Sequence, residues 1–187
     1  MLHHSSYRWL LTYRTLRRLR YSITLILGGA NAMAAATQSV ERLLDEAARC
    51  CERDGARLTE LRRWVLRCIL GADGPVTAYQ LVARLTEAGR RPAPPTIYRT
   101  IEFLLARKLI CRVECLNAFI GRADPDRHGD PVLLICRTCG SVTETDGQEV
   151  VDALDRVAAA RRFAKLEATI EVEGTCPGCR LESHNLR

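Results

Sequence analysis

Two Cys-x-x-Cys pairs in the C-terminal part of the chain constrain its fold more than any other feature. The first knuckle is Cys136–Cys139 and the second knuckle is Cys176–Cys179. Two such pairs supply four thiolates, which is enough to close a tetrahedral zinc site with no open coordination position. We therefore expect a structural zinc bound by Cys136, Cys139, Cys176 and Cys179.

A redox-active dithiol is the alternative for a Cys-x-x-Cys pair. Such a dithiol needs a thiolate of lowered pKa, usually beside a helix N-terminus. Neither knuckle precedes a clear helical pattern in the sequence. The sequence therefore favours the metal site over a thiol oxidoreductase.

Cysteine usage also bears on the compartment. Nine cysteines, an odd number spread over several segments, are unlike the disulfide framework of a secreted protein and fit a reducing cytoplasm. No apolar run approaches the ~18 residues that are needed to span a bilayer. We expect a cytoplasmic protein with no membrane partner, and its 47% hydrophobic and 27% charged residues are typical of a globular chain.

The positive charge is concentrated at the N-terminus. Residues 1–32 hold five arginines and no acidic residue, whereas the rest of the chain is nearly balanced within the total of +6. Global charge therefore says little about partners, and a DNA-binding role has to rest on local placement. We interpret residues 1–32 as a basic extension that is disordered or lies upstream of a true start at Met33; a basic arm and a signal peptide are the alternatives.

Four helices are predicted before the first knuckle. Apolar residues recur at helical spacing from Val40 onward. A second helix opens at Thr59, and a third opens at Thr77, where Gln80 completes a capping box. A fourth begins at Thr96, after a proline-rich connector that pre-sets its entry.

The fourth helix has two distinct faces. At about 100° per residue, Arg99 points nearly opposite the apolar Ile97. The outward face that carries Arg99 also groups Thr96, Thr100 and Phe103. Two extended runs, 110–115 and 118–120, follow as a hairpin. The pattern predicts a winged helix-turn-helix DNA-binding domain over residues 33–121, with a generic helical bundle as the alternative.

A second domain follows a polar linker. The linker is 122–131, and strands, both knuckles and one helix occupy 132–187. We expect Asp146 and Glu149 to form a capping box for that helix. Its apolar face carries Val150, Val151, Leu154, Val157 and Ala158. So small a unit has too little core to be stable alone, which zinc and dimerisation would remedy. The expected fold class is α+β, a winged helix-turn-helix domain followed by a small α/β dimerisation domain with a four-cysteine structural zinc.

Several short strings between residues 40 and 180 match a known family. They are Arg57-Leu58-Thr59, Thr77-Ala78-Tyr79, Pro94-Pro95-Thr96-Ile97-Tyr98-Arg99, Phe103-Leu104-Leu105 and the two knuckles. On these strings the chain resembles the ferric uptake regulator family and, within it, the zinc uptake regulator branch. The resemblance implies a homodimeric transcription factor, not an enzyme, that binds a double-stranded DNA operator and takes no small-molecule substrate. It also implies two zinc ions per subunit, one structural and one regulatory.

The resemblance assigns the DNA contacts to two helices. Tyr98 and Arg99 face DNA from the recognition helix, with Thr96 at its start and Tyr79 on the preceding helix. An arginine can fork onto guanine or phosphate, and a tyrosine ring can pack against a thymine methyl group. The residues alone leave open a partly buried Tyr79 and a solvated Arg99.

The regulatory zinc site is expected at Cys111, His128, Glu144 and Asp126. In this branch the site usually has a ligand on the wing, a cysteine after the wing, a hinge histidine and a glutamate after the first knuckle. By position, Cys111 stands for the wing ligand and Glu144 for the glutamate, while His128 sits one residue from the place of the histidine. A thiolate, an imidazole and carboxylates suit zinc without excluding cobalt or iron(II).

The cysteine after the wing is missing from this chain. Gly121 or Arg122 takes its place. Besides Asp126, the candidates for the fourth ligand are Asp124 in the linker and Cys115, which we expect on the same strand face as Cys111.

The expected function is that of a zinc-responsive repressor of zinc-acquisition genes, which binds a palindromic operator as a metal-loaded dimer. An iron- or peroxide-responsive repressor of the same family is one alternative. Those branches have histidine-rich hinges, whereas residues 33–187 hold only His128 and His184. A zinc-ribbon interaction module is another alternative, and it would leave Tyr98 and Arg99 without a role.

Overall fold

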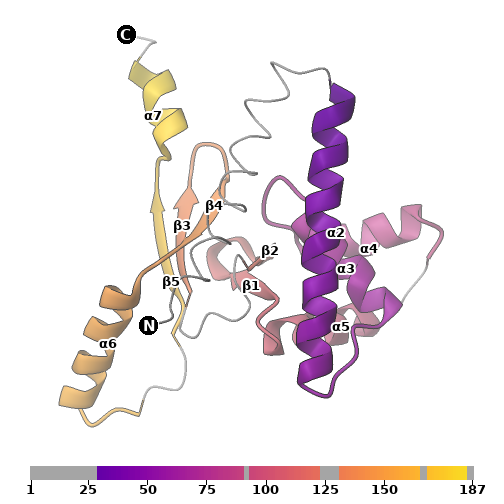
Figure 1. The fold of residues 1–187 in the computed structure, drawn as a ribbon. Coiled ribbons are helices and arrows are strands. Elements are labelled where there is room, and N and C mark those ends of the chain that lie inside the picture. The colour runs from indigo at the N-terminus through magenta and orange to yellow at the C-terminus, as the bar shows by residue number, and fades with distance from the viewer. Residues whose placement is uncertain (1–28, 91–92, 123–130, 165–167, 185–187) are drawn as a thin grey trace, which may run out of the picture.

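The computed structural model describes residues 29–90, 93–122, 131–164 and 168–184. Its elements run in the order α2, α3, α4, α5, β1, the 3-10 helix η1, β2, β3, β4, α6, β5 and α7. Figure 1 shows α2 to α5 and the β1–β2 hairpin beside a sheet of β3, β4 and β5. The predicted α+β class, a winged helical part followed by a small α/β part, is confirmed.

Helix α2 (Gly29–Arg53) is the longest element of the first part. Its apolar stripe is buried as predicted at Leu44, Ala47 and Cys51. The helix begins upstream of Val40 because its first turns are rich in alanine, the strongest helix former. Helix α3 (Glu60–Leu70) packs beside it, and Arg67 Nε donates to Glu41 Oε1 at 2.8 Å across the two helices.

Helices α4 and α5 begin differently. Helix α4 (Ala78–Glu87) has the predicted capping box, in which the Gln80 N–H donates to Thr77 Oγ1 at 3.2 Å and the Thr77 N–H donates to Gln80 Oε1 at 2.8 Å. Helix α5 (Pro94–Ala106) has proline in its first turn and no side-chain cap, since proline lacks an N–H group to satisfy. The predicted cap Thr59 precedes α3, but its side chain makes no capping hydrogen bond.

The wing is an antiparallel hairpin of β1 (Ile110–Val113) and β2 (Ala118–Gly121), with Cys111 opposite Ile120. The prediction that Cys115 shares a strand face with Cys111 is wrong. Strand β1 ends at Val113, and Cys115 lies exposed in η1 (Glu114–Leu116). The chain reverses through this 3-10 turn and through Asn117, whose φ is 44°, because asparagine tolerates the left-handed region.

The sheet of the second part has the order β4-β3-β5. Strand β3 (Val132–Cys136) is central, β4 (Val142–Thr145) pairs with it antiparallel, and β5 (Ile170–Gly174) pairs with it parallel. Helix α6 (Gln148–Ala160) forms the crossover between β4 and β5, and α7 (Pro177–His184) follows the sheet. Parallel neighbours need such a crossover connection.

Helix α6 departs from its prediction in two ways. Its N-cap is Gly147, without a side-chain cap, and Asp146 Oδ1 accepts from the Gln148 N–H at 3.3 Å instead of forming a box with Glu149. Of the apolar face only Val151 is buried, while Val150, Leu154 and Val157 are 47%, 39% and 63% exposed. Their periodicity therefore marks an apolar face that the described residues of one chain leave uncovered.

A small apolar cluster joins the wing to the sheet. It is built from buried residues of both parts: Cys111, Val113, Ile120, Leu133, Ile135 and Val142. The wing thus packs against the sheet that carries the first knuckle. None of the helices in the described segments is both long and apolar enough to cross a membrane.

Candidate metal centres and nucleic-acid interface

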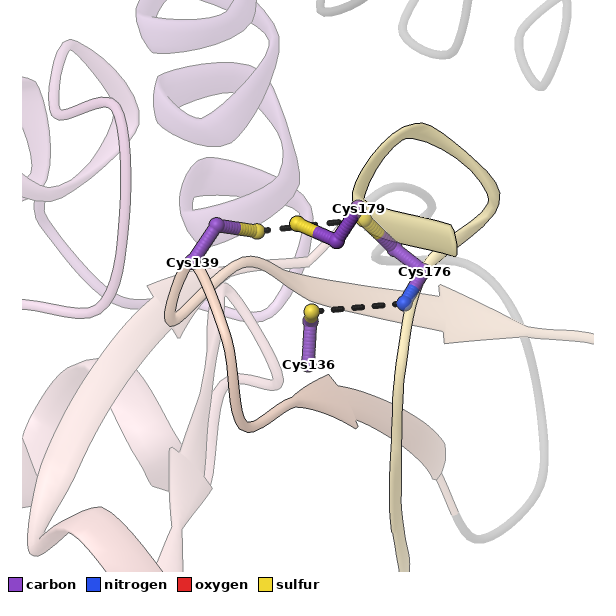
Figure 2. Close-up of side chains that lie close together, drawn as sticks. All are labelled: Cys136, Cys139, Cys176 and Cys179. Carbon is purple, nitrogen blue, oxygen red and sulfur yellow. Dashed lines mark hydrogen bonds between the residues drawn. The ribbon is translucent and has the colours of Figure 1, made fainter. Parts of the chain in front are cut away.

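The two knuckles meet because the strands that lead into them are neighbours. Cys136 ends β3 and lies opposite Gly174, the last residue of β5, in the parallel register. The first knuckle turns back at Gly140, whose N–H donates to the Cys136 carbonyl at 2.9 Å. The second knuckle begins just beyond β5. Both knuckles therefore lie at the same edge of the sheet, as Figure 2 shows.

The four sulfur atoms are spaced for a tetrahedral ion. All lie within 4.8 Å of one another, and Cys139 Sγ is 3.8 Å from Cys176 Sγ. A tetrahedron with Zn–S bonds of ~2.3 Å has S–S edges of roughly 3.8 Å. The structure thus brings the four predicted ligands together in a set that fits zinc.

Hydrogen bonds prepare two of these thiols for a metal. The Cys176 N–H, followed by the Cys139 N–H, lowers the pKa of Cys136 from 9.0 to about 6. The hydroxyl and N–H of Ser141 lower the pKa of Cys139, whose Sγ lies 3.2 Å from Ser141 Oγ. A hydrogen bond with Cys176 raises the pKa of Cys179. A metal ligand is the thiolate, so Cys136 is in its binding state at neutral pH.

The expectation that neither knuckle precedes a helix is wrong. Helix α7 starts at Pro177, directly after Cys176, so the second knuckle has the placement of many redox-active pairs. Its geometry nevertheless favours a metal, because Cys176 Sγ lies close to Cys139 of the other knuckle. Four converging sulfurs form a metal site, whereas a dithiol needs only two.

Two of the four predicted regulatory ligands lie in the described structure and are near each other. Cys111 is buried on β1 and Glu144 lies on β4. Burial, and after it the charge of Glu144, raises the pKa of Cys111 to about 12, while the charge of Arg122 acts in the opposite direction. His128 and Asp126, like Asp124, lie outside the described residues.

Arg122 is a residue of this region that sequence reasoning passed over. It follows β2 directly and is 5% exposed. Its Nη2 atom lies 3.2 Å from Glu144 Oε1, and the two side chains are only 4% and 5% exposed. The sequence contained a signal for Arg122, because Gly121 or Arg122 stands where the zinc uptake regulator branch carries the cysteine after the wing.

The predicted DNA-contacting residues are all exposed, Tyr79 on α4 and the other three on α5. Tyr79 and Tyr98 are 83% and 55% exposed, which is high for such large rings, and Thr96 and Arg99 are exposed beside Tyr98. Ile97 is fully buried, so the opposition of Ile97 and Arg99 is as predicted. Aromatic and basic side chains on the N-terminal turns of adjacent helices suit a nucleic-acid backbone and base edges.

Two other members of the expected outward face lie elsewhere. Thr100 is buried, and its Oγ1 donates to the Thr96 carbonyl at 2.9 Å. Position 100 falls between the apolar positions of the stripe, so the helix turns it inward despite its hydroxyl. Phe103 is half-buried, with the Arg62 guanidinium 3.5 Å from the centroid of its ring.

A carboxylate from the sheet also binds the wing. Glu171 on β5 accepts from the Cys115 N–H at 3.0 Å and from the Glu114 N–H. Burial alone would raise the pKa of Glu171, but these two N–H groups and the Cys115 thiol outweigh burial and lower it. Wing and sheet are thus held by a polar contact as well as by the apolar cluster.

Known proteins match this chain over most of its length. Residues 53–173 match the sequence model of the ferric uptake regulator family. The zinc uptake regulation protein of Escherichia coli (strain K12) is 34% identical over 143 residues, which cover 75% of this chain and 83% of that protein. The protein of the same name from Mycobacterium tuberculosis (strain H37Rv) is 30% identical over 128 residues, which cover 67% of this chain and 96% of that protein.

Solved structures match in three dimensions as well. A zinc uptake regulator complexed with zinc and DNA has a TM-score of 0.74 and 33% identity, with 78% of this chain and 97% of that chain covered. The holo form of XcZur has a TM-score of 0.69 and 37% identity, with coverage of 74% and 96%. The similarity therefore extends over both parts of the fold.

Proposed function

Because this chain belongs to the ferric uptake regulator family, whose members regulate transcription and are not enzymes, we propose that it is a zinc-responsive repressor of zinc-acquisition genes. The proposal is carried by one observation: the fold matches a zinc uptake regulator complexed with zinc and DNA over 78% of this chain. Active as a metal-loaded homodimer, it binds a palindromic operator. It acts in the cytoplasm, where its nine free cysteines stay reduced.

The structural zinc is held by both knuckles. Four thiolates leave no open position, so this ion stabilises the domain and senses nothing. Support comes from the sulfur spacing and from the lowered pKa of Cys136. Because the second part buries few apolar side chains, it depends on the metal for much of its stability.

DNA is contacted by Tyr79, Thr96, Tyr98 and Arg99. All four are exposed on the same pair of helices, and the large rings of Tyr79 and Tyr98 are 83% and 55% exposed. Arg99 forks onto guanine or phosphate, and the tyrosines supply ring contacts and hydroxyl contacts. In a dimer the two recognition helices would read the two halves of a palindrome.

The homodimer is supported by apolar surface on the second part. Leu134 and Val172 are paired in the β3–β5 register and are 45% and 49% exposed on the outer face of the sheet. Helix α6 adds Val150, Leu154 and Val157. Exposed apolar groups of this kind mark an interaction surface, and a second copy of the chain supplies the partner.

The regulatory zinc, the second per subunit, binds to Cys111 and Glu144, with His128 and Asp126 from the linker completing the set. The donor set of thiolate, carboxylates and imidazole fits zinc. When bound, zinc would supply positive charge that stabilises the Cys111 thiolate, whose proton leaves to solvent, and that attracts the carboxylates. Since Cys111 lies on the wing and Glu144 on the sheet, the ion fixes the two parts relative to each other and so sets the spacing of the recognition helices.

The test of the function is operator binding measured against buffered free zinc. We expect the affinity for the operator to rise by roughly 5- to 150-fold as zinc becomes available, since allosteric coupling is typically of that size. Unchanged affinity between zinc-starved and zinc-replete protein would overturn the proposal. A response to iron(II) in place of zinc would identify the iron-responsive alternative.

The two metal sites are separated by counting zinc. We expect about two zinc ions per subunit in the parent and about one in Cys111→Ser, with the structural ion retained. Cys50→Ser is the matched control, because it removes a free thiol of the first helix that takes no part in either site. If Cys111→Ser still binds two zinc ions per subunit, Cys111 is not a ligand of the regulatory site.

A further inference from the structure

The buried ion pair of Arg122 and Glu144 lies at the junction of wing and sheet. Arg122 directly follows β2 of the wing, and Glu144 is part of β4. Both side chains are more than nine-tenths buried, and the Nη2 and Oε1 atoms are 3.2 Å apart. The cation of this pair comes from the protein itself and shares the surroundings of Cys111 and Glu144.

The pair is incomplete. Its one direct contact of 3.2 Å is longer than the ~2.8 Å typical of a hydrogen bond between charged groups. The Nε atom of Arg122 is buried and has no hydrogen-bond partner among the residues that the structure describes. An arginine that is fully bound by a carboxylate uses two parallel N–H groups. Burial removes the water that hydrates the Arg122 guanidinium, and the contact with Glu144 offsets only part of that loss in free energy.

From this geometry we propose that Arg122 is a competing cation of the regulatory site, whose guanidinium occupies Glu144 and has to leave before zinc binds there. The inference rests on the proposed function, because it takes Glu144 as a zinc ligand. It assigns Arg122 the role of a residue that determines zinc affinity without being a ligand itself.

Competition follows from the charges. A guanidinium has no acceptor atom and stays protonated at any physiological pH, so it neither binds zinc nor becomes neutral beside it. Two cations at one buried carboxylate repel each other strongly, since charges are poorly screened in the protein interior. Zinc binding therefore requires Arg122 to move its head group away from Glu144.

The consequence is a regulatory site with reduced affinity. The energy of breaking the pair is subtracted from the energy of binding zinc, so the free zinc concentration that fills the site is raised. The structural site is made of four thiols that converge on one another, whereas Arg122 pairs with Glu144 of the regulatory site. Arg122 thus separates the affinities of the two sites.

The experiment measures the affinity of the second zinc by competition with a chelator, on the full chain with its structural zinc in place. Arg122→Met removes the charge and keeps the length of the side chain. We expect the variant to bind the second zinc at least about tenfold more tightly than the parent, since breaking a buried charge pair is no longer required. Arg122→Lys, which keeps the charge, is expected to stay within about threefold of the parent.

The matched control is Arg112→Met. Arg112 lies on the same hairpin and loses the same charge, but it is exposed and pairs with Glu114 instead of Glu144. We expect its zinc affinity to equal that of the parent. If Arg122→Met does not fold, as judged by circular dichroism, Arg122→Gln replaces it, because the amide still donates to Glu144 while the charge is removed.

The outcomes separate the two proposals. Equal or weaker affinity for the second zinc in both uncharged variants, with two ions bound, overturns the role of Arg122 and leaves the proposed function intact. A second zinc in Arg122→Met but not in the parent supports the competition in its strongest form. No second zinc in any variant overturns the regulatory site at Glu144 and, with it, the role of Arg122.

Discussion

The backbone N–H of Cys176 donates to Cys136 Sγ across the two knuckles, with 3.3 Å between nitrogen and sulfur. This contact joins the ends of β3 and β5 through the protein's own atoms. It also stabilises the thiolate form of Cys136.

The affinity of the knuckles for zinc should fall more steeply once the pH drops below about 6, where protons compete for the Cys136 thiolate of the metal-free site. The folded pKa of Cys136 lies below the ordinary value of 9.0, so the thiolate is present above about 6 and is protonated below it. Protons and zinc compete for the same sulfur atoms. The measurement is zinc release to a chelator at a series of pH values, and equal release at about pH 7.5 and 5 would contradict it.

Cys136→Ser should lose the structural zinc and melt the second part of the chain. A hydroxyl does not replace a thiolate as a zinc ligand. Metal analysis and thermal unfolding measure the two effects. The matched control is Cys68→Ser, which alters a half-buried cysteine of α3 and should keep the metal. Full zinc retention in Cys136→Ser would contradict the four-cysteine assignment.

Arg99→Ala should weaken operator binding by about 1–3 kcal/mol without lowering thermal stability. The side chain is exposed and next to Tyr98, so its removal leaves the core unchanged. Fluorescence anisotropy with a labelled operator measures the loss. Arg161→Ala removes an exposed arginine at the end of α6 and serves as the charge-matched control. The same loss in both variants would mean that only net charge matters.

Leu154→Glu should shift the protein from dimer to monomer. Leu154 is 39% exposed on the uncovered face of α6, and a charge buried at an apolar interface without a partner is strongly unfavourable. Sedimentation velocity at a series of protein concentrations measures the change. Leu116→Glu alters a similarly exposed leucine of η1, 42% exposed, and should leave the dimer intact.

Gly147→Ala should destabilise the second part by about 1–3 kcal/mol. A Cβ atom at Gly147 would lie 2.9 Å from the Cβ of Val132, which is closer than real Cβ atoms approach. Gly174→Ala is the matched control, because a Cβ atom there meets nothing within 4 Å. Chemical denaturation of the zinc-loaded protein measures both variants, and equal stabilities would contradict the predicted clash.

Glu171→Ala should loosen the wing from the sheet at a cost of about 0.5–1 kcal/mol, since two N–H groups at the surface return to water. The pKa of Glu171 is lowered in the folded protein. The stability that the ionised Glu171 contributes to the folded state is therefore complete above the unfolded pKa of ~4.3. It is lost only as the pH falls further, through the folded pKa.

Hydrogen exchange of the Cys115 amide at neutral pH measures the loosening. Glu173→Ala removes the next carboxylate of the same strand face, which pairs with the exposed Arg137 at 3.0 Å, and should leave that amide protected. Equal exchange in the parent and in Glu171→Ala would mean that the carboxylate does not hold the wing.

Much of the fold was predictable because it is encoded in local patterns. The capping box at Thr77 involves residues three positions apart, and the opposition of Ile97 and Arg99 follows from the helical repeat. The four cysteines were predicted as one site because closed tetrahedral zinc sites use paired Cys-x-x-Cys spacing. Short-range rules were sufficient for the first two features, and the known ligand spacing of zinc sites was sufficient for the third.

The features that escaped prediction depend on distant parts of the chain. Arg122 belongs to a polar stretch by composition, and the carboxylate that lies against its buried guanidinium, Glu144, comes from a strand 22 residues further along the chain. The apolar stripe of α6 has the right period, but a period does not say whether the covering surface lies in the same chain. Cys115 left the predicted strand because the chain had to reverse there.

Parallel pairing of Cys136 with Gly174 ties metal binding to the alignment of β3 and β5. A slip of one residue along this pair would move one knuckle by ~3.3 Å relative to the other. The four sulfurs, now within 4.8 Å of one another, would then no longer surround one ion. Zinc binding therefore selects for the correct register of β3 and β5, because a chain that pairs these strands incorrectly does not retain the ion.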